Sequence, residues 1–213
     1  MPPIDHCLLM GRHLVTFGEG IESDLKNDIL DCLLYAQSSA DSLFSRSRDG
    51  WRWQEEYQRS ILSTGGQPFG RGARGRLKIH DLRDLSRRAA FTELATSAEL
   101  KQLLTTSFDA LMSSEPARKY FDSWFASSGR SESFQVVPCE AQENGRVNIL
   151  VCGLQMRTSA LRPARYFWQV LGGEMVVGYS GATFRFRREA YEPARSRVQE
   201  ALFQKAEREI VRL

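Results

Sequence analysis

Apolar residues recur at three- and four-residue steps over much of the first half of the chain, which is the spacing of an amphipathic helix. The longest such stretch covers residues 21–44, with charged residues mostly between the apolar ones. Asp49, a residue type favoured at helix N-caps, precedes a second stretch over 50–62. We therefore expect two long helices here, and three further helical pieces over 82–95, 98–112 and 115–125.

After Gly129 the period changes from helical to extended. Two strands, over 132–141 and 147–156, flank Asn144 and Gly145, a dipeptide typical of tight hairpins. Further strands are expected over 165–171, 175–179 and 182–187, followed by a surface helix over 189–211. This half of the chain therefore predicts a β-meander closed by a terminal helix.

The expected strand over 147–156 differs from the others because it is apolar on both faces. Val147, Ile149 and Val151 point one way, and Leu150, Cys152, Leu154 and Met156 point the other way. A strand of this kind must be covered on both sides. We therefore expect it in the centre of the sheet, under helices.

Together these elements indicate an α+β fold in a single domain over residues 1–213. Helices are expected over about 1–128, and an antiparallel β-meander with a C-terminal helix packed on it over about 129–213. With 213 residues, 42% of them hydrophobic, the chain can bury a substantial core.

Composition and charge mainly serve to exclude classes of protein. The net charge is only +3, which gives no strong nucleic-acid signal. No apolar run approaches the roughly 20 residues that cross a bilayer, and the N-terminus lacks a signal-peptide pattern. We expect a cytoplasmic protein in the producing cell, which associates with membranes or leaves the cell by a route that needs no signal peptide.

Residues 65–78 are rich in glycine and basic residues, so we expect a flexible surface loop. Its arginines, Arg71, Arg74 and Arg76, would contact an anionic lipid or RNA. One aromatic residue, Phe69, accompanies them, which provides no ladder for base stacking. The segment matches no phosphate-binding glycine motif, and a solvated surface loop is the plainer interpretation.

Side chains with catalytic or metal-binding chemistry are scattered along the chain. His6, His13 and His80 lack the spacing of metal ligands, and the sequence contains no full motif for a catalytic serine or cysteine. We therefore expect no metal and name no catalytic residue. The four cysteines are too widely separated to predict a zinc site or a disulfide scaffold.

Cys152 is the thiol of most interest, because it lies in the two-faced strand beside Leu150 and Leu154. A thiol buried in apolar surroundings has a raised pKa and is a poor nucleophile at neutral pH. If it were acylated, its apolar neighbours would receive the chain, and each buried methylene would contribute roughly 0.8 kcal/mol. An inert core cysteine is the alternative interpretation.

Two segments of the chain together resemble a known family. Residues 25–62 contain a helix with an Ala-Gln and Ala-Asp core, followed by a helix that carries Trp and Tyr. Residues 165–202 contain an aromatic strand, a glycine turn, a final strand and a Tyr-x-x-x-Arg helix. In these features the chain is similar to the bacterial virulence factor Evf family. The matching residues are Ala36, Gln37, Ala40, Asp41, Trp51 or Trp53, Tyr57, Phe167, Trp168, Tyr191 and Arg195.

The resemblance implies an α/β protein that carries palmitate on a cysteine as a thioester, with the chain held in an internal hydrophobic tunnel. Cys152 is the expected attachment site, and Cys139 and Cys32 are the alternatives. The side chains expected to line the tunnel are Leu150, Leu154, Met156, Phe167 and Trp168.

We therefore expect a non-enzymatic, virulence-associated protein that carries palmitate or binds lipid. Its expected partners are a fatty acid or membrane lipid, and a host target. Two alternatives remain open. One is an enzyme that acts on a small hydrophobic substrate in the same cavity, and the other is an anionic-lipid or RNA binder that uses residues 71–78.

Overall fold

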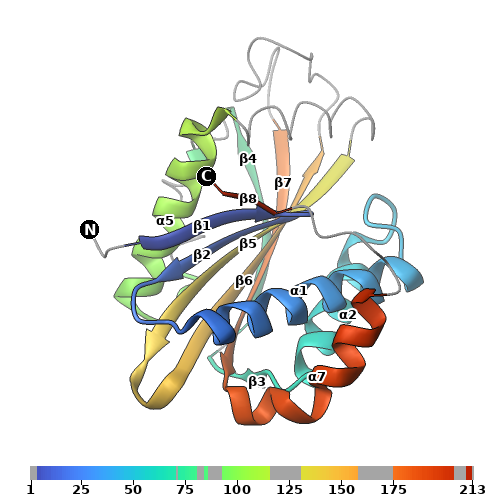
Figure 1. Cartoon of the computed structure of the whole chain (residues 1–213). Coiled ribbons are helices and arrows are strands. Elements are labelled where there is room, and N and C mark those ends of the chain that lie inside the picture. The colour runs from blue at the N-terminus through green and yellow to red at the C-terminus, as the bar shows by residue number, and fades with distance from the viewer. Residues whose placement is uncertain are drawn as a thin grey trace.

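The computed structural model describes residues 4–70, 72–80, 84–85, 93–115, 131–157, 175–203 and 210–212. Within these residues, strands from both halves of the chain form one sheet, and helices cover both of its faces (Figure 1). The α+β class expected from the sequence is confirmed.

The described strands form an eight-stranded mixed sheet in the order β3-β7-β6-β5-β2-β1-β8, and β4 also pairs with β7. All of these pairs are antiparallel except β2 with β5, which is parallel. The bounds of the strands are β1 Ile4–Met10, β2 His13–Gly18, β3 Gln67–Pro68, β4 Ala73–Ile79, β5 Ser131–Gln142, β6 Arg146–Arg157, β7 Met175–Phe186 and β8 Ile210–Arg212.

The expected hairpin is present between β5 and β6. Asn144 and Gly145 both have positive φ angles, 61° and 66°, as a tight hairpin turn requires. β7 continues the meander on the far side of β6 as one strand, where the sequence predicted two with a bend between them. The strand expected over 165–171 lies outside the described residues.

The first half of the chain contributes strands that the sequence analysis did not predict. β1 and β2 form a hairpin around Gly11, whose φ is 52°, and β2 then lies beside β5. All six residues of β2 are buried. The sheet is therefore mixed, and the expectation of a wholly helical first half was wrong. A short strand covered on both faces shows no alternation of polar and apolar residues, so its period does not reveal it.

Residues 73–79 are also a strand, not the flexible loop expected over 65–78. All seven residues of β4 pair with β7. The strand lies at an edge of the sheet, where glycine weakens a strand but does not prevent one. Most of its side chains are exposed or half-buried, so the hydrophobic pattern gives no sign of it.

The helices agree better with the sequence pattern. The described helices are α1 Ser23–Leu43, α2 Gly50–Ser63, α5 Ala98–Ser113 and α7 Arg188–Phe203, so the helices expected over 21–44, 50–62 and 98–112 are confirmed. The terminal helix expected over 189–211 is present as α7 over Arg188–Phe203, whereas Ile210 and Val211, expected at its end, belong to β8. Residues 93–94 form a turn, and most of the expected helices over 82–95 and 115–125 lies outside the described residues.

The helices divide the core into two layers. α5 covers one face of the sheet, and α1, α2 and α7 cover the other face (Figure 1). Alternate residues of β6 serve the two layers, with Leu150 and Cys152 on the α5 side and Ile149 and Val151 on the other side. The expectation that β6 is covered on both faces is confirmed.

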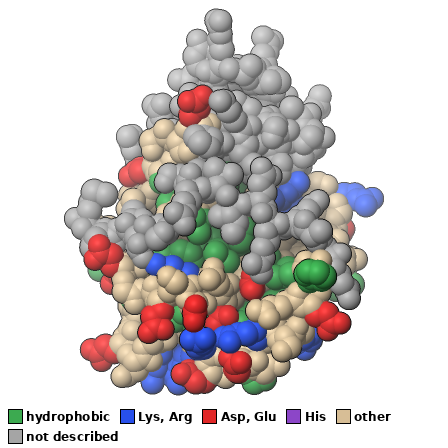
Figure 2. All heavy atoms as spheres, in the orientation of Figure 1, with side chains coloured by type: hydrophobic (Ala, Val, Ile, Leu, Met, Phe, Trp, Pro, Cys, Tyr) green, Lys and Arg blue, Asp and Glu red, His purple; other side chains and the backbone are tan. Residues whose placement is uncertain are grey.

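Charged side chains are spread over the outside of the helical layer. Figure 2 shows acidic and basic groups interspersed at the lower end of the molecule, where α1 and α7 lie in Figure 1. Two ion pairs, Asp24 with Arg188 and Asp28 with Arg195, join these helices. None of the helices in the described part of the chain has the length and apolar character needed to cross a bilayer.

Candidate functional site

Cys152 lies in the middle of β6, between Val136 of β5 and Gly181 of β7 in the strand register. Its side chain faces the α5 layer and is completely buried. Leu150, Leu154 and Met156, expected to line a tunnel, belong to the same buried apolar cluster. The structure thus brings these four predicted residues together in one layer.

The four thiols differ in their polar contacts. Cys7 hydrogen-bonds to Thr16 at 3.4 Å, and Cys32 hydrogen-bonds to Thr64 at 3.0 Å. The Cys139 Sγ lies 3.7 Å from the carbonyl oxygen of Val137. For Cys152 the structure gives no hydrogen bond among the residues that it describes. A thioester has no S–H donor, so acylation of Cys152 would sacrifice no hydrogen bond seen here.

Burial makes all three candidate thiols weak nucleophiles. It raises the pKa of Cys32 to about 12, although the hydrogen bond to Thr64 opposes the shift. It also raises the pKa of Cys139 and that of Cys152 far above the ordinary value. At neutral pH the folded chain therefore holds Cys152 as a neutral thiol out of reach of solvent. Transfer of an acyl group to it requires that this layer be open.

The other predicted site residues are only partly placed. Phe167, Trp168 and Arg71 lie outside the described residues. Arg74 and Arg76 are exposed on β4, two positions apart, and so share the face of the sheet that α2 covers. Trp53, Tyr57 and Tyr191, which match the Evf family pattern, are fully buried in the layer of α1, α2 and α7.

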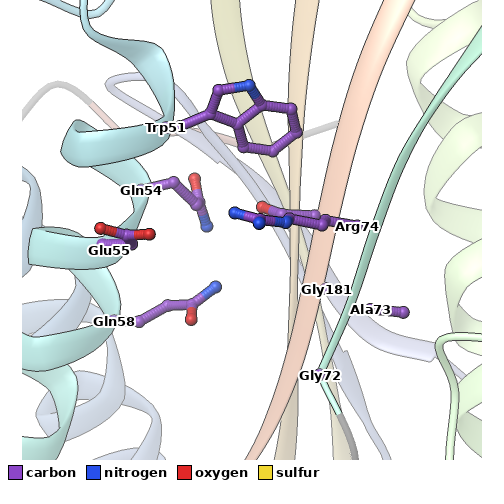
Figure 3. A pocket seen from close by; sticks show the side chains of 9 residues that line it. Trp51, Gln54, Glu55, Gln58, Gly72, Ala73, Arg74 and Gly181 are labelled. Atoms are coloured by element: carbon purple, nitrogen blue, oxygen red, sulfur yellow. The ribbon is translucent and has the colours of Figure 1, made fainter.

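A cleft that the sequence analysis missed lies between α2 and the β4–β7 edge, and we call it the α2 cleft. Its volume is about 270 Å³. Trp51, Gln54 and Gln58 project into it from α2, and the guanidinium group of Arg74 reaches toward Gln54 from β4 (Figure 3). Its remaining lining residues are Glu55, Gly72, Ala73, Ser180 and Gly181.

The α2 cleft continues inward as a small hollow of about 10 Å³. Trp51, Gln54 and Ser180 line both parts, and the inner part adds Ser133, Gln135 and Gly153 among others. The side-chain atoms Gln54 Nε2, Ser133 Oγ and Gln135 Oε1 are buried there without a hydrogen-bond partner among the described residues. Three unpaired polar atoms at one small hollow distinguish this place from ordinary core packing.

The residues that line the α2 cleft are brought together by the spacing of side chains along α2 and by the register of the strands. Residues 51, 54, 55 and 58 lie on one side of α2, because they are spaced by three and four. Across the sheet, the register aligns Gln135, Gly153, Ser180 and Arg74 on four neighbouring strands. The polar stripe on α2 is visible in the sequence, but its counterpart on the sheet depends on the strand order.

A metal site finds no support in the part of the chain that the structure describes. There, no group of three or more His, Cys, Asp or Glu side chains lies close enough together to hold an ion.

The fold and its sites define an α+β protein with a mixed sheet between two helical layers, a buried thiol on one face and a polar cleft on the other. No protein-family model matches the sequence, and a search of curated proteins finds no relative. Among solved structures, a delta-endotoxin is similar with a TM-score of 0.47 and 9% identity, over 81% of this chain and 80% of that one.

The structure of the Evf virulence factor is similar with a TM-score of 0.43 and 12% identity, over 92% of this chain and 82% of that one. At this identity and TM-score, neither likeness identifies a family or an activity.

Proposed function

We propose that this protein is a non-enzymatic carrier of a fatty acyl group, palmitate in the first instance, attached to Cys152 as a thioester. The observation that carries the proposal is the place of Cys152. Its sulfur is buried among apolar side chains of the α5 layer and, within the described residues, has no polar partner. The binding partner of the protein would be a fatty acid or membrane lipid. The resemblance to the Evf family extends the proposal to virulence and a host target.

The proposed attachment reaction is a thiol–thioester exchange. Cys152 would lose its proton and form the new C–S bond, while an acyl-thioester donor would release its own thiol. Since the folded thiol is neutral and buried, this exchange must precede closure of the α5 layer. Leu94, which packs against Gly181 beside Cys152, would have to shift for a long chain to follow β7.

The acyl chain would be held inside the protein and would not act as a membrane anchor. Each methylene buried in the α5 layer would contribute about 0.8 kcal/mol to retention of the chain. Membrane association would then require that the chain leave this layer, because a chain enclosed by protein makes no contact with lipid.

Intact-mass measurement of the full chain, before and after neutral hydroxylamine, tests this function. We expect a mass excess of one acyl chain that hydroxylamine removes and that Cys152→Ala lacks. Cys139→Ala is a matched control, because Cys139 is equally buried but faces the other layer. The bare polypeptide mass, together with a solvent extract that contains no fatty acid, would show that the proposal is wrong.

The other two functions stay predictions. These are an enzyme that acts on a small hydrophobic substrate in the same layer, and an anionic-lipid or RNA binder at residues 71–78. None of the contacts among the described residues favours either over acyl carriage.

A further inference from the structure

We propose that the α2 cleft binds a neutral ligand with several hydroxyl groups, such as the terminal sugar of a carbohydrate. This inference goes beyond the acyl-carrier function and does not depend on it. Gly153 and Cys152 are neighbours in β6, but Gly153 lines the cleft under α2 while Cys152 faces α5. The two sites therefore lie on opposite faces of one strand.

The inner hollow selects the chemistry of the group that enters it. Gln54, Ser133 and Gln135 are 6%, 5% and 1% exposed, so their unpaired atoms are largely withheld from solvent. A buried polar atom left without a partner lowers the stability of the folded chain, because it has lost its hydrogen bonds to water. A ligand hydroxyl group that pairs with these atoms recovers that cost.

A hydroxyl group suits this hollow better than a charged group does. Gln54 Nε2 is a donor and Gln135 Oε1 is an acceptor, and a hydroxyl group both accepts and donates. A carboxylate or phosphate oxygen would accept from Gln54 but would oppose the carbonyl oxygen of Gln135. An ammonium group would have the reverse conflict. The Ser133 hydroxyl can adopt either role and so does not alter the choice.

The sizes of the two parts are consistent with one hydroxyl inside and a ring outside. The inner hollow, at about 10 Å³, holds about one water-sized group. The outer part, at about 270 Å³, lies near the lower end of small-molecule sites. Gly153 leaves room for the two glutamine side chains, because a methyl group there would overlap the side-chain oxygens of Gln54 and Gln135.

The outer part is suited to the rest of such a ligand. Trp51 lines both the outer part and the inner hollow, and the C–H surface of a sugar ring can pack against its aromatic side chain (Figure 3). Gln58, Glu55 and Arg74 supply donors and acceptors around it. Since Glu55 and Arg74 carry opposite charges, neither an anion nor a cation meets a lining of uniformly favourable charge.

Saturation-transfer NMR on the full chain tests the proposal with the methyl glycosides of glucose, galactose, mannose and N-acetylglucosamine. A parallel arm uses phosphatidylcholine vesicles with and without galactosylceramide, which distinguishes a free sugar from a lipid-displayed one. We expect a response to at least one sugar, in one or both arms. Trp51→Ala and Gln54→Leu should weaken binding about tenfold or more.

Two controls separate binding from folding. Arg52→Ala changes an exposed residue of α2 outside the cleft and should alter affinity by less than about twofold. Gln54→Leu removes a buried amide whose Nε2 has no partner among the described residues, so its urea midpoint should stay equal to that of the parent or rise. Lost binding with retained stability would support a ligand site.

The proposal is overturned if no sugar responds in either arm, or if Trp51→Ala and Gln54→Leu bind as the parent does. Inorganic phosphate is the competing probe. Phosphate binding that salt and Arg74→Gln abolish, without any sugar response, would assign the cleft to anions instead.

Discussion

At the scale of single residues, His13 at the start of β2 has hydrogen bonds at both of its ring nitrogens. Its Nε2 lies 2.7 Å from the Tyr57 hydroxyl, and its Nδ1 lies 3.2 Å from the carbonyl oxygen of Met10. A carbonyl can only accept, so Nδ1 carries the proton and Nε2 accepts from Tyr57. Tyr57 stacks on Trp53, whose indole N–H donates to Asp41 at 2.8 Å. The imidazole is therefore buried and neutral, and the network that holds it ends at the exposed carboxylate of Asp41.

This network predicts a loss of stability in mild acid. Burial, with a smaller contribution from Arg46, lowers the pKa of His13 to about 3. Between about pH 6.5 and about pH 3 the unfolded chain therefore binds a proton that the folded chain does not. Over this range the free energy of unfolding decreases by about 1.4 kcal/mol for each unit by which the pH is lowered. Urea unfolding at pH 7 and pH 5 measures this loss.

His13→Gln should reduce the difference between the two pH values, because glutamine does not titrate. His80→Gln is the matched control, since His80 is exposed. If His13→Gln kept the full pH dependence of the parent protein, the neutral buried imidazole would not be its source.

At the scale of the elements, α1 and α7 are joined by Asp28 and Arg195. Arg195 Nη2 donates to Asp28 Oδ2 at 2.6 Å, and the two side chains are 20% and 9% exposed respectively. Burial nevertheless raises the pKa of Asp28, because desolvation of its carboxylate outweighs the attraction of Arg195. Arg195 also pairs with Glu192 of its own helix at 2.9 Å.

The two partners should therefore respond unequally to substitution. Arg195→Met leaves the Asp28 carboxylate buried without its nearest cation and should cost about 3 kcal/mol. Asp28→Asn leaves Arg195 with Glu192 and should cost only about 1 kcal/mol. Urea unfolding of the two variants at pH 7 checks the asymmetry. Equal losses would mean that burial of Asp28 does not dominate the pair.

At the scale of the whole molecule, the sheet separates two apolar layers. Val136 and Val137 are consecutive in β5 and fully buried, but Val136 belongs to the α5 layer and Val137 to the layer of α1, α2 and α7. The same separation places the buried thiol and the α2 cleft on opposite faces of β6. Occupation of one site thus need not disturb the other.

Substitutions at these two valines test whether both layers contribute to stability. Val136→Ala and Val137→Ala should each lower the free energy of unfolding by about 2 kcal/mol, since each removes buried methyl groups from a packed layer. Val176→Ala in β7 is the control, because Val176 is exposed, and should cost much less. A near-neutral result at either buried valine would mean that its layer is loosely packed.

Local pattern was enough to predict much of this fold. The spacing of apolar residues in α1, α2 and α5 predicts helices directly. Asn144 and Gly145 determine the β5–β6 turn, because few residue pairs adopt the backbone conformations that it requires. The two apolar faces of β6 also followed from its sequence, because side chains alternate along a strand whatever lies beside it. These features depend on neighbours within a few residues.

The remaining features depend on residues far apart in the chain. β4 is a strand because β7 supplies its hydrogen-bond partners, and β2 reaches the sheet centre by pairing with β5. The α2 cleft needs the register that sets Gln135, Gly153, Ser180 and Arg74 side by side on four strands. Sequence by itself therefore determined the local elements and the faces of β6. Only the tertiary structure decided which strands pair, and with them where the polar groups converge.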